Sequence, residues 1–175
     1  SFRFNISLRK YLTMLNYTWP LIVIGIAGVI NEVSDKIFLK YLSDGSLVAE
    51  EQVGIYAANY KIAVLMTIFI QMFNYAAEPF FFKKSLAKDA KESYSVVMDY
   101  FVIFCLLIFL MVTMYIDIFK YFIGSEFHEG LDIVPVVLLA NMFLGIYYNL
   151  SVWYKINNKT YCGAVISVIG MIITL

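Results

Sequence analysis

Charged residues are scarce in this sequence: they make up 15% of its 175 residues, against about a quarter in soluble domains. A soluble fold buries only ~70–75% of the surface of its unfolded chain, too little to hide a chain that is 62% hydrophobic and 18% aromatic. Neither positive nor negative charge is in excess, because the thirteen basic and thirteen acidic residues cancel. A nucleic-acid partner is therefore not expected, and the composition favours a protein whose solvent is the lipid bilayer.

Residues that carry catalytic or metal chemistry are also few. The single histidine, His128, has no second histidine to pair with as a metal ligand, and the two cysteines, Cys105 and Cys162, lie inside apolar runs. The sequence contains no phosphate-binding loop, no dinucleotide-binding glycine motif and no nucleophile elbow. We therefore expect no metal, no cofactor and no enzymatic activity.

Long apolar runs are the dominant feature of the chain. A helix needs about 20 apolar residues to cross the ~30 Å hydrocarbon core of a bilayer, and five segments meet or approach this length once their helix-compatible flanks are included. The sequence thus predicts an all-α, polytopic transmembrane helix bundle forming a single transmembrane region, incomplete at both ends. The predicted spans are residues 11–42, 53–82, 94–117, 132–154 and 160–175.

The basic residues alternate between the segments that separate these spans. Nine of them precede span one or lie between spans two and three or spans four and five. The opposite side has only Lys120 and, near the end of span one, Lys36 and Lys40. Because Lys and Arg near span ends are retained on the cytoplasmic side, the N-terminal segment and the Lys83–Lys91 loop are predicted to be cytoplasmic.

Two of the predicted spans carry a polar face. At 100° per residue, span one aligns Thr13, Asn16, Pro20, Ala27, Asn31 and Ser34, with Asp35 beside them. Span two aligns Tyr60, Thr67, Gln71, Asn74 and Glu78, with Asn59 and Lys61 on the two flanks. Single polar residues of this kind can simply join helices through hydrogen bonds, but strips this long favour helices that line a water-filled pathway.

The two ionisable residues of span two, Lys61 and Glu78, are 17 residues apart, or about 25 Å along a helix, so they cannot pair with each other. Lys61 has two interpretations: it faces a cavity and binds an anionic group, or it pairs structurally with Asp35 or Glu32. Glu78 either lines the pathway or reaches the inner headgroup layer, where it snorkels or forms an ion pair.

Prolines inside the first two spans are predicted to kink them. Pro20 and Pro79 each remove a backbone donor and clash with the carbonyl four residues earlier. Bends of this kind suit helices that move, although membrane helices are in general richer in proline than soluble ones.

Several segments resemble one transporter family. Residues 53–62 read VGIYAANYKI and open a span that ends in EPFFF at 78–82; a proline-containing span precedes them and runs into SDKIF at 34–38. Together with residues 147–155 (YYNLSVWYK), they resemble the oligosaccharide flippases, the polysaccharide and O-antigen branch of the multidrug/oligosaccharidyl-lipid/polysaccharide transporter superfamily.

This resemblance implies a fragment from the second bundle of a transporter with 12 to 14 spans, whose partners are the bilayer, a lipid-linked oligosaccharide and the remainder of the same chain. The family moves undecaprenyl-pyrophosphate-linked oligosaccharides across the bacterial inner membrane by alternating access, for polysaccharide and lipopolysaccharide biosynthesis. Basic residues in its central cavity hold the anionic headgroup, a role that Lys61 could take here.

Two alternatives stay open. The chain could be a drug or cation antiporter of the same superfamily, with Asp35 or Glu78 at its binding site. It could also be a membrane-embedded assembly partner, or part of a membrane glycosyltransferase, without transport of its own.

Overall fold

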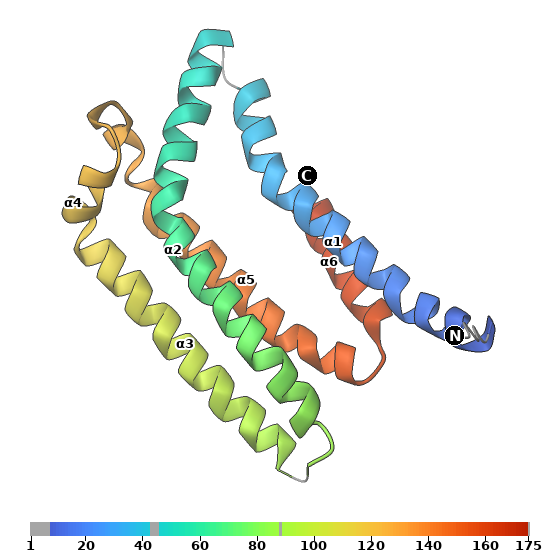
Figure 1. Ribbon diagram of the computed structural model, residues 1–175. Coiled ribbons are helices and arrows are strands. Elements are labelled where there is room, and N and C mark those ends of the chain that lie inside the picture. The colour runs from blue at the N-terminus through green and yellow to red at the C-terminus, as the bar shows by residue number, and fades with distance from the viewer. Residues whose placement is uncertain (1–7, 43–45, 88, 175) are drawn as a thin grey trace, which may run out of the picture. The chain divides into compact units, whose positions relative to one another are not determined.

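The computed structural model describes residues 8–42, 46–87 and 89–174; for Glu32, Asp35, Leu39, Leu42 and residues 46–49 it describes the backbone alone. These described residues form helices and no strand, so the predicted all-α class is confirmed (Figure 1). The elements are α1 (Leu8–Leu42), α2 (Ser46–Lys84), α3 (Ala90–Met114), α4 (Ile116–Phe119), the 3-10 helices η1 (Lys120–Phe122) and η2 (Ser125–Gly130), α5 (Ile133–Ile156) and α6 (Thr160–Thr174).

Four of these helices are long and apolar enough to cross a membrane: Leu8–Phe38 within α1, Glu50–Lys84 within α2, and the whole of α3 and α5. Five spans were predicted. The fifth, α6, has 15 described residues, about 22 Å at 1.5 Å per residue, which is short of the ~30 Å hydrocarbon core. The predicted continuation of span one beyond Asn31 is confirmed, since α1 is unbroken to Leu42.

The chain separates into two compact units, which are described one at a time. Unit 1 comprises residues 1–38 and 153–175, that is, most of α1, the end of α5 and α6. Unit 2 comprises residues 39–152, which hold α2, α3, α4, η1, η2 and most of α5.

The core of unit 2 lies where α2, α3 and α5 meet. Met66, Phe101 and Leu138, one from each helix, are fully buried there. The Phe101 ring stacks on Phe69 with centroids 5.9 Å apart and also contacts Phe73. Gly145 of α5 permits this packing, because a Cβ at that position would lie 2.7 Å from Cζ of Phe101.

The turn between α2 and α3 closes one end of unit 2. Tyr94 donates a 2.8 Å hydrogen bond from its hydroxyl to the carbonyl of Phe81 and packs edge-on against the Phe81 ring. Lys84 forms a 2.6 Å ion pair with Asp89, and this hydrogen bond lowers the pKa of the Asp89 carboxyl. We call this the lysine-loop end of unit 2.

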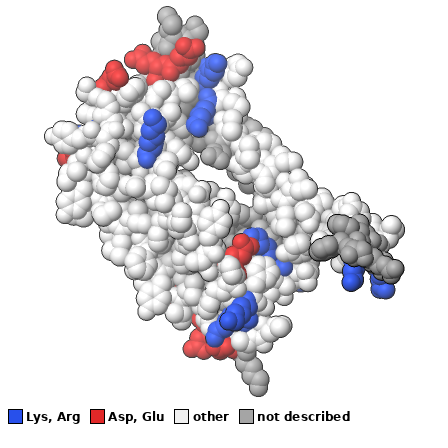
Figure 2. All heavy atoms as spheres, in the orientation of Figure 1, with Lys and Arg blue, Asp and Glu red and all other residues white. Residues whose placement is uncertain are grey.

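The opposite end of unit 2 begins where α3 breaks at Tyr115, whose φ of −105° and ψ of 25° leave the helical range. Span three was predicted to continue to residue 117, but α4 starts as a separate short helix at Ile116. Carboxylates are concentrated at this end, which we call the acidic end; Figure 2 shows those over the start of α2. They belong to Glu50, Glu51, Asp117, Glu126, Glu129 and Asp132.

In unit 1, α6 packs along α1 (Figure 1). Thr160 donates a 3.1 Å hydrogen bond from its hydroxyl to the carbonyl of Tyr17. This contact lies next to the Asn16 carbonyl, which Pro20 deprives of its helical donor, and Pro20 itself is buried inside α1. Gly163 allows α6 to approach α1 closely, because a Cβ there would lie 2.9 Å from Ile24 Cδ1.

Candidate functional site

Asn59 of α2 fastens the helix to η2 at the acidic end. Its side-chain Nδ2 donates hydrogen bonds to the carbonyls of Ile55 (2.9 Å) and Phe127 (2.8 Å). The side chain is fully buried, and a Cβ at Gly130 would come within 2.6 Å of Ile55 Cγ2. The sequence places Asn59 among the pathway candidates, whereas the structure uses its amide to hold this loop; we call this contact the Asn59 clamp.

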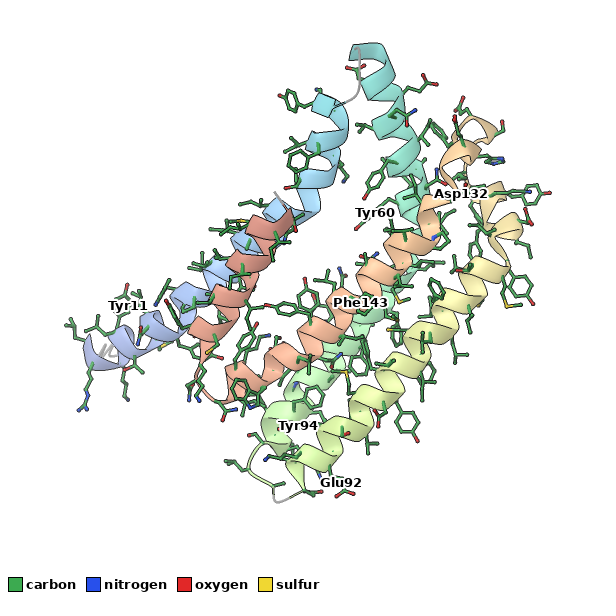
Figure 3. The ribbon with its side chains drawn as sticks, turned by 180° about the vertical axis from the view of Figure 1, so that it is seen from behind. Tyr11, Tyr60, Glu92, Tyr94, Asp132 and Phe143 are labelled. Atoms are coloured by element: carbon green, nitrogen blue, oxygen red, sulfur yellow. The ribbon has the colours of Figure 1, made fainter. Side chains whose placement is uncertain are left out.

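Lys61 lies two residues further along α2, about 200° around the helix from Asn59, and is exposed. Figure 3 shows its neighbour Tyr60 at the same end of unit 2 as Asp132, with Glu92 and Tyr94 at the opposite end. Lys61 therefore lies near the acidic end of the span rather than at its centre. Glu78, about 25 Å along the helix, is half-buried and lies toward the lysine loop.

The other residues of the polar strip of α2 lie along the edge of the buried face of that helix. Thr67 and Asn74 are half-buried, Tyr60 is half-buried as well, and Gln71 is exposed. The Thr67 hydroxyl oxygen is buried with no hydrogen-bond partner among the described residues. The strip is therefore neither fully lipid-facing nor part of the apolar core.

Two buried amides of α5 extend this polar region. Asn141 and Asn149 are both 8% exposed and lie four residues before and after Gly145. Nδ2 of Asn149 donates to the carbonyl of Gly145 at 3.3 Å, but its Oδ1 and the Nδ2 of Asn141 are buried without a partner in the described part of the chain. The sequence analysis named neither residue as a site candidate, although Asn149 lies in the 147–155 segment and the spacing of i, i+4 and i+8 around a glycine is a visible signal.

Helix geometry places the polar groups of α2 and α5 at matching heights. Gly145 faces Ile70, since a Cβ there would lie 2.9 Å from Ile70 Cγ1. Each of the four polar residues is three or four positions from this contact, about one turn away, and within about 60° of it around its own helix. We call these residues the polar seam: Thr67 and Asn74 of α2, and Asn141 and Asn149 of α5.

The polar strip of span one lies in unit 1. Ser34 is buried and its hydroxyl donates to the carbonyl of Ile30 at 2.6 Å, while the Oδ1 of half-buried Asn31 has no partner among the described residues. Thr13 donates back to the carbonyl of Arg9. The side chain of Asp35 lies outside the described part of the structure, so its predicted pairing with Lys61 stays a prediction.

Pro79 is exposed within the unbroken helix α2.

The described residues contain no group of three His, Cys, Asp or Glu side chains that could hold a metal ion. Cys105 is buried and Cys162 is exposed, and both are free thiols.

Comparison with known proteins finds no matching family model, no matching curated protein and no matching solved structure.

Proposed function

We propose that this chain belongs to a membrane transporter that flips undecaprenyl-pyrophosphate-linked oligosaccharide across the bacterial inner membrane by alternating access, for polysaccharide and lipopolysaccharide biosynthesis. The resemblance of its motifs to oligosaccharide flippases suggests the substrate. Support from the structure comes from polar groups placed on membrane-length helices.

The polar seam is the observation that carries the proposal. Hydrocarbon offers no hydrogen bonds, and each unsatisfied polar group there costs several kcal/mol. Thr67, Asn141 and Asn149 nonetheless bury polar atoms without a partner among the described residues. A pathway for a hydroxyl-rich glycan explains these atoms, because sugar hydroxyls and water supply both donors and acceptors when the seam opens.

Lys61 takes the second role in this proposal, as a contact for the pyrophosphate headgroup. It is exposed on α2 near the acidic end, on the helix face opposite Ile70 and the polar seam, so we assign the contact to the outer mouth of the pathway rather than to the seam or the membrane centre. The acidic end as a whole carries more carboxylates than lysines, which weakens the hold of one lysine on an anion. Weak binding at this end suits release of the headgroup into the outer leaflet.

The test is glycan export by the full-length protein in an export-deficient strain. Lys61→Ala should abolish export while the protein accumulates normally in membranes, and Lys61→Arg should retain part of the activity because the charge is kept. Lys120→Ala is the matched control, since Lys120 lies at the same end but is paired with Asp117 at 2.7 Å. Normal export by Lys61→Ala would eliminate the headgroup role.

Accumulation distinguishes this role from the structural pair. If Lys61 instead pairs with Asp35, Lys61→Ala should fail to accumulate and should be rescued when Asp35→Asn is added, because removing both partners leaves no stranded charge. Movement of charged drugs without movement of a lipid-linked sugar would favour the antiporter alternative and contradict the proposal.

A further inference from the structure

Two polar atoms on neighbouring helices of unit 2 are shielded from solvent without a hydrogen-bond partner. They are the hydroxyl oxygen of Thr67 on α2 and Nδ2 of Asn141 on α5, and neither finds a partner in the described part of the chain. Asn141 as a whole is 8% exposed, and it follows the fully buried core residue Leu138 by about one turn. Leaving an amide N–H unpaired at such a place is costly, so a partner is expected there.

α2 and α5 pack against each other and run in the same direction (Figure 1). At the acidic end, a Cβ at Gly130, which precedes α5, would lie 2.6 Å from Cγ2 of Ile55. Fifteen residues after Gly130, a Cβ at Gly145 would lie 2.9 Å from Cγ1 of Ile70, which is itself fifteen residues after Ile55. The two segments therefore advance together between these contacts.

Thr67 and Asn141 lie at matching positions on the two helices. Thr67 comes three residues before Ile70 and Asn141 four before Gly145, which puts each of them about 4 to 6 Å from this contact, toward the acidic end. Thr67 is turned from Ile70 by about 60° in one sense, and Asn141 from Gly145 by about 40° in the other. Because the two parallel helices face each other, opposite turns bring both side chains to the same side of the contact.

α3 lies on the other side of this contact. Phe101 of α3 packs on Phe69 and Phe73, and both of these rings are turned from Ile70 in the sense opposite to Thr67. The space beside Thr67 therefore receives no polar group from α3. Water can fill such a space, since one molecule both accepts from an amide and donates to a hydroxyl.

We propose that Thr67 and Asn141 hold one ordered water molecule between α2 and α5. The water accepts a hydrogen bond from Asn141 Nδ2 and donates one to the Thr67 hydroxyl oxygen, and its second proton bonds to a helical carbonyl, which keeps a free lone pair. Buried waters make about three such bonds. The site does not depend on what is transported, so it holds whether or not the chain is a flippase; in the proposed transporter, a sugar hydroxyl replaces this water when the polar seam opens.

Nuclear Overhauser contacts between water and asparagine side chains test this site, in the full-length protein carrying isotope-labelled asparagine in detergent micelles. The Nδ2 protons of Asn141, assigned from their loss in Asn141→Leu, should show a cross-peak to water with the sign of a long-lived contact. Asn157 is the control, because it is exposed and surface water exchanges too fast to give this sign. Absence of the cross-peak at Asn141, or the same cross-peak at Asn157, would overturn the proposal.

Two substitutions at Thr67 distinguish a bound water from a direct bond between the side chains. Thr67→Val keeps the shape of the side chain but removes the hydroxyl, and it should abolish the cross-peak at Asn141 because the water loses a polar partner. Thr67→Ala leaves room for water and should keep the cross-peak. An unchanged cross-peak in Thr67→Val would overturn the proposal. Its loss in Thr67→Ala would also do so, since the hydroxyl itself would then be the partner of the amide.

Discussion

Removing the Asn59 clamp should release the η2 loop from α2. In Asn59→Ala the carbonyl of Ile55 keeps its own helical donor, the backbone N–H of residue 59, but the carbonyl of Phe127 loses the 2.8 Å bond from Asn59 Nδ2. Because Asn59 is fully buried, the unsatisfied carbonyl and the lost packing cost ~1–3 kcal/mol. That free energy multiplies the population of the detached loop by about 5 to 150.

Cleavage by a glutamate-specific protease measures this population, because Glu126 and Glu129 lie in the loop. When opening is fast relative to cleavage, the rate follows the population of the open form. We expect cleavage of detergent-solubilised Asn59→Ala at these two sites to be ~5- to 150-fold faster than in the wild type. Asn59→Asp should be faster still, since a buried carboxylate faces the Phe127 carbonyl without a donor.

Asn157→Ala is the matched control. Its side chain makes the same kind of bond, from Nδ2 to the carbonyl of Trp153 at 2.7 Å, but it is exposed. It should change cleavage in the loop little, as surface substitutions stay within about 0.5 kcal/mol. Equal cleavage rates for Asn59→Ala, Asn157→Ala and the wild type would refute the assignment of Asn59 as the clamp.

Three further predictions concern packing and topology. Gly145→Ala should destabilise the protein by ~1–3 kcal/mol in thermal unfolding, because its Cβ would press on Phe101. Gly170→Ala, whose Cβ would meet nothing within 4 Å, should be neutral or stabilising. Equal melting temperatures for the two variants would contradict the packing described. Thr160→Val should lower stability by ~0.6 kcal/mol, the average for an interhelical hydrogen bond in a membrane, and a melting temperature at or above that of the wild type would argue against its bond to α1. An impermeant maleimide added outside intact cells should label Glu129→Cys and spare Lys83→Cys, and the reverse pattern would overturn the predicted orientation.

Most of the helix positions could be predicted from the sequence. Apolar runs fix where α2 and α5 lie, and the amphipathic continuation past Asn31 correctly extends α1 to Leu42. The end of α3 is less predictable, because residues 115–117 are as helix-compatible as those before them. No turn signal in the sequence marks the break at Tyr115.

The candidate site was harder to predict, since it depends on contacts between distant segments. Periodicity places Asn59 on the flank of a polar strip, but it cannot show that the Phe127 carbonyl, 68 residues later, binds its amide. Asn141 and Asn149 were not named as candidates because buried amides within an apolar run look like ordinary helix-packing residues until their burial and unpaired atoms are seen.

The central claim is movement of a lipid-linked oligosaccharide between leaflets, and proteoliposomes containing the full-length protein test it most directly. A glycan-cleaving enzyme added outside reaches the substrate in the outer leaflet only, so the inner pool is cleaved as fast as it is flipped. We predict rapid cleavage of both pools with the wild-type protein, and cleavage of about half the substrate with Lys61→Ala or with protein-free liposomes. An inner pool that stays protected in the presence of the folded wild-type protein would contradict the proposed function.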